Sequence, residues 1–194
     1  MTYDSIRDKI VLIPRKVDIN SVEVIGDYLW DQPIKNADFV FLYGYIDAEG
    51  NIQRIEKDQV KQWGCQPTYE YALKNTEKLF SPKYFVELNK EIKIENCHSD
   101  IVCVSNSKST LGAVSIFYPG NADKVAKNFG SDFYFCFISL DDCMCHKIGT
   151  IDPEKIKEFV MTTNSIYNDG YGLSNKVYKY NFLEKSFEML DIQW

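Results

Sequence analysis

Short hydrophobic runs, many alternating with polar residues, recur along the chain between turn residues and predict β-strands. The run at 9–17 is expected at a sheet edge or a bend, because Pro14 cannot donate to a strand ladder. The runs at 37–47 and 51–55 predict a hairpin, since "DAEG" between them supplies turn residues. Further strands are expected at 100–106 and 113–120, which form a second hairpin, at 132–139 and 143–149, and in a last hairpin within 175–190.

Apolar residues at helical spacing predict helices between these strands, at 56–64, 67–80, 121–130 and 152–164. Gly64 and Gly130 suit left-handed C-terminal caps. Asn121 and Asp152 are expected as N-caps, with Pro153 at the first helical position. The apolar faces of the second and fourth helices comprise Tyr69, Ala72, Leu73, Thr76 and Phe80, and Ile156, Phe159, Val160 and Thr163.

This order of elements predicts an α+β fold in which antiparallel hairpins pack against several helices. One compact domain is expected over 1–194, because no repeat, low-complexity tract or linker composition interrupts it. The mixed stretch 81–99 is expected to be a connection with a short helix or strand, and the place of a weak seam.

Composition fits a soluble globular protein. Of the 194 residues 45% are hydrophobic, which is enough for a core without disulfides or metals. The net charge of −6 is dispersed along the chain, and the sequence has no run rich in lysine and arginine that could bind a phosphate backbone. A nucleic-acid partner is therefore disfavoured. The N-terminus resembles no signal peptide and no window approaches the roughly 20 apolar residues of a membrane helix. A cytoplasmic protein with free cysteines and no membrane association is therefore expected.

Several short motifs occur in an order that is similar to a known family. They are "WG" at 63–64, "ALKNT" at 72–76, "VSN" at 104–106, "GA" at 112–113, "YPG" at 118–120, "GSDFY" at 130–134, "DPEKIKEFV" at 152–160, "LS" at 173–174 and "VYKY" at 177–180. The chain resembles the C-terminal portion of domain of unknown function 5688, and more distantly domain of unknown function 1444. The resemblance implies a bacterial protein from anaerobic Firmicutes or their mobile elements. The family label names no activity, so it does not indicate a reaction.

One segment departs from that family. Where members tend to have Pro-Ser-Ser-x-His-Glu, this chain has residues 137–142, with Ser139 retained. The histidine position is Asp141 and the glutamate position is Asp142. If the segment is catalytic in relatives, its histidine is absent here.

The stretch "CMCH" at 143–146 and "CH" at 97–98 suggest a metal site with Cys97, His98, Cys143, Cys145 and His146 as ligands. Strand geometry argues against it, because Cys143 and Cys145 stand on one face with roots about 7 Å apart, and His146 faces the other way. The alternative is a set of core and surface thiols. The sequence therefore predicts no metal and no other cofactor.

A thiol nucleophile needs a neighbouring base and a lowered pKa. Cys65 lies near a predicted helix start, and Cys145 precedes His146, but neighbours on a strand point apart. Carboxylate chemistry has a different candidate set, in which Asp132, Asp141 and Asp142 hold a divalent metal. The alternative is that "LDD" at 140–142 is a solvated turn.

Exposed aromatic residues are the remaining candidates for function. Tyr28, Trp30, Tyr171 and Trp194 lie in or beside predicted loops or chain ends, where such rings anchor protein contacts. The alternative for Trp30 is closure of a core edge. The first hypothesis is a non-enzymatic protein that binds and regulates a protein partner, such as a host defence protein. The second is a divalent-metal-dependent hydrolase or nuclease. The oligomeric state stays open.

Overall fold

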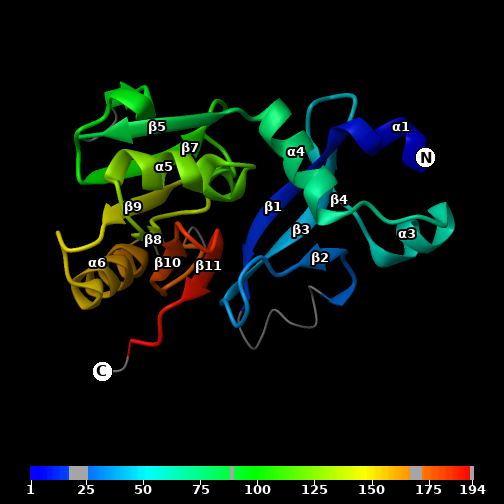
Figure 1. Ribbon diagram of the computed structural model, residues 1–194. Helices are drawn as coiled ribbons and strands as arrows, with labels where there is room; N and C mark the ends of the chain where they lie inside the picture. The colour runs from blue at the N-terminus through cyan, green and yellow to red at the C-terminus, as the bar shows by residue number, and fades with distance from the viewer. Residues whose placement is uncertain (18–25, 88–89, 167–171, 193–194) are drawn as a thin grey trace.

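Two antiparallel sheets form the framework of the molecule (Figure 1). The computed structural model describes residues 1–17, 26–87, 90–166 and 172–192. In these residues the strands form a small sheet of four strands and a large sheet of seven. The small sheet lies on the right in Figure 1 and the large sheet on the left. The α+β prediction is confirmed.

The small sheet is centred on β3, which pairs along its whole length with other strands. Its strands are β1 (Ile10–Lys16), β2 (Trp30–Asp31), β3 (Phe39–Ile46) and β4 (Ile52–Arg54). The helical segments beside it are α1 (Tyr3–Ile6), η1 (Arg7–Lys9), α3 (Lys57–Trp63) and α4 (Tyr69–Leu79). The predicted first hairpin is β3–β4, and both predicted helices are present.

β1 is an edge strand, as Pro14 predicts. In the described part of the chain it pairs only with β3. On its other side the backbone N–H of Leu12 donates to Thr76 Oγ1 of α4, at 2.9 Å. The same hydroxyl donates to the carbonyl of Ala72 at 2.7 Å, so the buried Thr76 side chain joins helix and strand.

The large sheet has the strand order β11-β10-β8-β9-β7-β5-β6. Its strands are β5 (Pro82–Val86), β6 (Lys90–Ile92), β7 (Ile101–Asn106), β8 (Phe133–Phe137), β9 (Cys143–Lys147), β10 (Tyr178–Asn181) and β11 (Ser186–Met189). The helical segments of this half are η2 (Ile94–Asn96), η3 (Gly112–Phe117), α5 (Asn121–Phe129) and α6 (Pro153–Ile166). The stretch 81–99, expected as a connection, contains the β5–β6 hairpin and η2.

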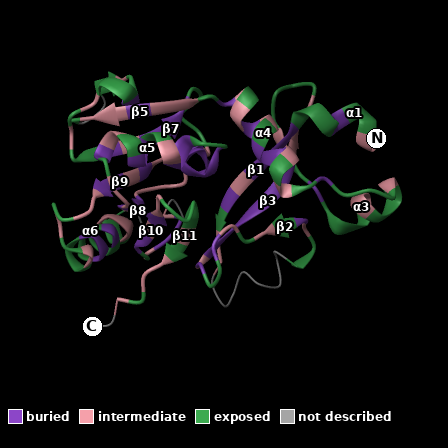
Figure 2. Cartoon of the chain, in the orientation of Figure 1, coloured by how far each residue is buried: buried purple, intermediate pink, exposed green. Residues whose placement is uncertain are grey.

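Aromatic rings from both sheets meet in one core, whose residues are coloured as buried in Figure 2. Phe39 of β3 lies 5.0 Å from Phe137 of β8 and 5.7 Å from Tyr178 of β10, measured between ring centroids. Phe41 lies 5.2 Å from Phe117 of η3. Tilted and edge-to-face contacts of this kind add to the free energy gained by burial.

A charged group reinforces the joint between the sheets. The carboxylate of Asp38, just before β3, accepts hydrogen bonds from the hydroxyls of Ser174 and Tyr178, the latter at 2.8 Å. Both donors are fully buried. The two sheets are thus linked by hydrogen bonds as well as by aromatic packing.

The large sheet has a second face, which is covered by α6. Ile156 and Val160 of this helix pack against Cys136 of β8 and Val177. The predicted core position of Phe159 is wrong, because this side chain is 45% exposed. Lys157 is buried in its place, and its Nζ donates to the carbonyl of Ile192 at 2.7 Å. The long aliphatic stem of lysine can line an apolar surface while its amine reaches a polar partner.

The strand expected at 113–120 is also wrong, because most of this segment lies in the 3₁₀ helix η3. All six residues of η3 are buried, so the apolar run carries no alternation that would separate strand from helix. Leu111 enters it in a left-handed conformation with φ 54°. A Cβ on Gly112 would lie 2.2 Å from the carbonyl oxygen of Asp141, so only glycine fits this close approach.

The N-terminus of α5 differs from the prediction by one residue. Gly120, with φ 73°, occupies the N-cap position expected for Asn121. The Asn121 side chain is buried instead, where it accepts from the hydroxyl of Tyr84 and donates to the carbonyl of Ser115 at 2.6 Å. Gly130 ends the helix in a left-handed conformation, as expected.

Candidate functional site

The side of the small sheet that faces away from the aromatic core carries two of the predicted aromatic residues, Tyr28 and Trp30. Partners across an antiparallel ladder share a face, and residues along a strand alternate between faces. Trp30 is opposite Leu42, Arg15 is opposite Val40, and Arg54 is opposite Gly44. We call this side the outer face, and it comprises Ile13, Arg15, Tyr28, Trp30, Val40, Leu42 and Arg54. Val40 and Leu42, which are 3% and 1% exposed, are buried on it.

Aromatic and cationic groups are combined on the outer face. Trp30 is 41% exposed. Tyr28 is half-buried against Val40 and Leu42, and the guanidinium carbon of Arg54 lies 5.4 Å from the centre of its ring. A cation over an aromatic face is attracted by the ring quadrupole. Two of the predicted binding residues, Tyr171 and Trp194, lie outside the described residues.

The outer face holds Arg15 and Arg54, two of the three arginines in the chain. Both are exposed, and neither forms an ion pair with a described residue. The third arginine, Arg7, lies in η1 within 4 Å of Asp4 and Asp8. The sequence prediction missed Arg15 and Arg54. Their alternation with hydrophobic residues in two predicted strands was the signal that could have placed them on one face.

Within "CMCH", the two thiols and the imidazole lie on opposite sides of the large sheet. Cys143 and Cys145 face the aromatic core, whereas His146 is paired with Tyr134 on the face that carries α6. The predicted separation of thiols and imidazole is confirmed. Cys97 packs at the core edge and His98 is exposed. Within the described ranges, no group of three or more His, Cys, Asp or Glu side chains is placed to hold a metal ion.

The buried thiols are poorly suited to nucleophilic chemistry. Burial raises the pKa of Cys103 to about 12, and it also raises those of Cys136 and Cys143. A thiol that stays protonated at neutral pH is a weak nucleophile. Cys65, the candidate beside a helix start, is exposed between α3 and α4.

The three candidate aspartates do not converge. Asp132 precedes β8, whereas Asp141 and Asp142 follow its far end, which puts them roughly 17 Å apart along a five-residue strand. Asp132 accepts the N–H of Phe182 at 2.9 Å and lies 3.3 Å from the amine of Lys179, and these two contacts lower its pKa.

Asp141 also binds backbone. Its carboxylate accepts the N–H of Leu111 at 2.6 Å, and its own N–H donates to the Ser139 hydroxyl at 3.0 Å. Burial raises the pKa of Asp141. The "LDD" segment connects β8 and β9 and anchors the entrance to η3. The alternative interpretation is right about the connection between strands but wrong about solvation, because residues 140–142 are all partly buried.

Three motifs of the family resemblance have similar structural roles. Thr76 of "ALKNT" binds the β1 edge, and Ser105 of "VSN" donates to the carbonyl of Asp141 at 2.8 Å. Ser174 of "LS" donates to Asp38. These motifs thus describe how the fold is held together.

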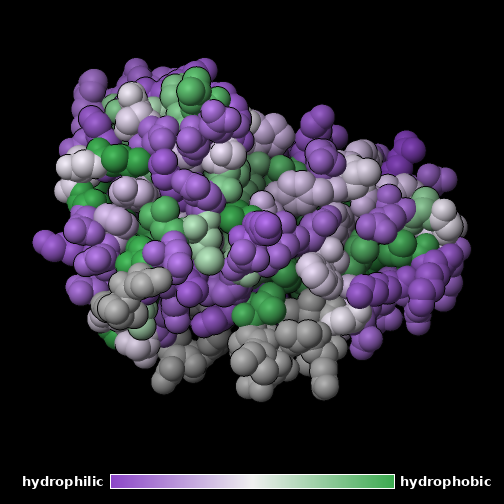
Figure 3. Space-filling view, turned by 60° about the horizontal axis from the view of Figure 1, so that its bottom comes forward, coloured by the Kyte–Doolittle hydropathy of each residue, from purple (hydrophilic) through white to green (hydrophobic). Residues whose placement is uncertain are grey.

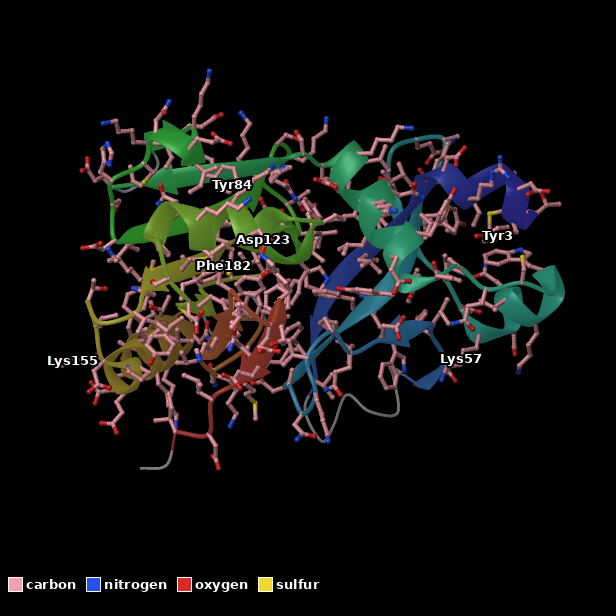
Figure 4. The ribbon with its side chains drawn as sticks, in the orientation of Figure 1. Tyr3, Lys57, Tyr84, Asp123, Lys155 and Phe182 are labelled. Atoms are coloured by element: carbon pink, nitrogen blue, oxygen red, sulfur yellow. The ribbon has the colours of Figure 1, made fainter. Side chains whose placement is uncertain are left out.

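A small cleft lies between α5 and the β10–β11 hairpin. Its volume is about 260 Å³, and its polar wall is Asp123, which accepts from the hydroxyl of Tyr180 and the amine of Lys185, each at 2.6 Å. Burial raises the pKa of Asp123, but these two donors outweigh it and the net shift is downward. Figure 4 shows Asp123 close to Phe182, whose ring lies 4.2 Å from the amine of Lys185. The cleft's charged groups therefore satisfy one another.

An apolar groove of about 390 Å³ lies on the same face of the large sheet as α6, over the part of that face that the helix does not cover. Its hydrophobic wall includes Phe85, Ile101, Cys103, Ile138 and Met144. On the face shown in Figure 3, hydrophobic side chains form small separate patches among hydrophilic ones.

His146 gives the protein a testable response to acid. Its side chain is 4% exposed, and neither ring nitrogen has a hydrogen-bond partner among the described residues. Burial lowers its pKa to about 4. The unfolded state, with a pKa near 6.5, therefore takes up a proton at a higher pH than the native state does.

We expect this residue to lower the free energy of unfolding by about 2 kcal/mol between pH 7 and pH 5, and the loss should level off as the pH falls below the native pKa of about 4. His146→Phe should reduce the pH 7 to pH 5 difference by that amount, measured by urea unfolding. His98→Gln, at an exposed position, should leave the difference unchanged. An unaltered pH profile in His146→Phe would show that other groups cause the acid response.

Comparison with known proteins identifies the family of this chain. A protein-family model described as "Family of unknown function (DUF5688)" matches residues 39–181. The match runs from the first residue of β3 to the last residue of β10, so it includes strands of both sheets. No curated protein and no solved structure matches the chain. Among the described residues, no helix is long and apolar enough to cross a membrane.

Proposed function

Because the chain belongs to the DUF5688 family, whose function is unknown, we propose its function from its own surface: it binds and regulates a protein partner through the outer face. The observation that carries the proposal is the exposed ring of Trp30 beside Tyr28 and two arginines that have no ion-pair partner in the described residues. Tryptophan, tyrosine and arginine are the residue types that dominate binding energy at protein interfaces.

The proposed setting is the bacterial cytoplasm, with a host protein as the partner. The resemblance to families of mobile elements supports a role in which the protein blunts a host activity, such as a defence system. A nucleic-acid partner is not proposed, because the net charge of −6 opposes binding to phosphate backbones. No observation in the described residues favours the metal-dependent hydrolase, since each candidate cluster is dispersed or bound to backbone.

The test is capture of a partner from the native host, followed by a direct binding measurement with the protein recovered. Trp30→Ala should weaken that binding by about 30-fold or more, because a central interface tryptophan contributes about 2 kcal/mol or more. Circular dichroism and urea unfolding should show an intact fold, since Trp30 is far from fully buried.

Phe159→Ala is the matched control, because Phe159 is an aromatic side chain of similar exposure on α6, at the large sheet. It should leave binding unchanged. A partner whose affinity is the same for the wild type and for Trp30→Ala would contradict the proposal.

A further inference from the structure

The outer face carries positive charge on a chain with an acidic surplus. The net charge is −6, yet Arg15 and Arg54 share this face and neither has an ion-pair partner among the described residues. An unpaired guanidinium keeps its capacity for two parallel hydrogen bonds to a carboxylate. The seven residues that define the outer face thus carry two positive charges and no negative charge.

Three carboxylates close in sequence to these strands are engaged elsewhere. Asp31 accepts from the hydroxyl of Tyr43 on the opposite face of the sheet. Asp38 binds Ser174 and Tyr178, and Asp47 accepts the backbone N–H of Asn51 at 2.8 Å within its own turn. None of these three carboxylates pairs with Arg15 or Arg54.

The register of the sheet sets the size of that anion. Arg15 and Arg54 are opposite residues four apart on β3, and they lie on its two sides. This places their Cα atoms about 13 Å apart along the strand and about 10 Å apart across it, or about 16 Å in all. A single small anion is too short to reach both, whereas an extended segment of about five or six residues spans them.

Trp30 lies between the arginines along the strand direction, at the level of Leu42. Its exposed ring offers an apolar contact in the middle of the charged face. Interfaces are strongest where a desolvated aromatic anchor is surrounded by polar contacts. The arrangement fits a segment with carboxylates toward both ends and an apolar or aromatic residue between them.

We propose that the outer face recognises an acidic protein segment of about six residues, with carboxylates on Arg15 and Arg54 and an apolar side chain on Trp30. This inference rests on the proposed function and adds the chemistry of the partner. The apolar groove of the large sheet is a weaker candidate for docking, because nothing in the structure shows what covers it.

The experiment uses the full chain and a glutamate–tyrosine copolymer as the acidic probe, with polylysine and a thymidine oligonucleotide as comparison probes. Isothermal titration calorimetry at low salt should detect binding of the copolymer alone. Raising the ionic strength to about 0.5 M should weaken it by about tenfold or more, since exposed charges are then screened. Arg15→Gln and Arg54→Gln should each weaken binding by about fivefold to tenfold, because each removes one charged contact.

Arg7→Gln is the matched control, because Arg7 is the remaining arginine and lies beside Asp4 and Asp8 in η1. Its affinity for the copolymer should equal that of the wild type. The inference is overturned if the double variant Arg15→Gln/Arg54→Gln binds the copolymer as the wild type does. It is also overturned if no binding is detected at about 100 μM. If the protein binds the oligonucleotide and this binding requires the two arginines, the partner is a nucleic acid and the inferred acidic protein segment is wrong.

The captured host partner separates this inference from the proposed function. If its binding depends on Trp30 but not on the two arginines, the proposed function stands and the acidic segment is wrong. If its binding depends on neither, the proposed function fails.

Discussion

Replacing Gly112 by alanine is expected to lower the free energy of unfolding by about 3 to 5 kcal/mol. The added Cβ would lie 2.2 Å from the carbonyl oxygen of Asp141 and 2.5 Å from the hydroxyl oxygen of Ser105. The carbonyl belongs to the backbone between β8 and β9, so relief requires a shift of that connection. Because Asp141 also holds the N–H of Leu111, the shift would disturb the entrance to η3 and the position of Phe117 in the core. Urea unfolding measures the loss.

The control for this substitution is Gly26→Ala. A Cβ on Gly26 meets no atom within 4 Å, and its φ lies outside the positive region that disfavours alanine. Its effect should stay within about 0.5 kcal/mol. A loss of less than about 1 kcal/mol in Gly112→Ala would show that the β8–β9 connection yields easily.

Removal of the Asp38 carboxylate should weaken the attachment of the two sheets to each other, because it removes hydrogen bonds that link them. We expect Asp38→Ala to lower the free energy of unfolding by about 3 to 5 kcal/mol. The main loss is the pair of hydrogen bonds from two buried hydroxyls to a charged acceptor, at about 1.5 to 3 kcal/mol each, and the longer bond from the N–H of Asn175, at 3.3 Å, is lost as well. The hydroxyls of Ser174 and Tyr178 are fully buried. Without Asp38 they would keep their contact with each other, at 2.7 Å, and Ser174 Oγ would still accept the N–H of Lys176, at 3.0 Å. Thermal and urea unfolding of the variant measure this loss.

A double-mutant cycle with Tyr178→Phe tests the origin of the loss. Once Tyr178 lacks its hydroxyl, removal of Asp38 should cost less than it does in the wild type, because the two groups are in contact. Asp191→Ala, at an exposed carboxylate, is the control and should change stability by less than about 0.5 kcal/mol. Additive effects in the cycle would contradict the role assigned to this hydrogen bond.

The sequence predicts elements well where polar and hydrophobic residues are spaced by local geometry. The β3–β4 hairpin, α3 with Gly64 and the pair β8–β9 were all predicted, because turn residues, caps and alternation mark them. The segment 113–120 was not, because every residue of η3 is buried and its conformation depends on Gly112 meeting the backbone of a distant loop. The same limit explains Phe159 and Lys157, whose burial depends on which flank of α6 meets the chain near Ile192.

The candidate site was predicted in part. Tyr28 and Trp30 were identified as aromatic residues near a loop, and Trp30 is exposed. Arg15 and Arg54 were missed because they are 39 positions apart in the sequence and meet only through pairing with β3. Asp132 and Asp141 were grouped by closeness in sequence, but they lie at opposite ends of β8, so the length of that strand separates them.

The contact between Thr76 and Leu12 bears on how the protein behaves in a crowded solution. An open edge strand is a template on which another chain can add a strand, and such additions lead to aggregation. On β1 the donor of Leu12 is occupied by a helix side chain that is itself fully buried, and Pro14 offers no donor at all. A strand from another molecule could add to the small sheet at this edge only after displacing α4. The helix therefore protects the protein from polymerising through β1.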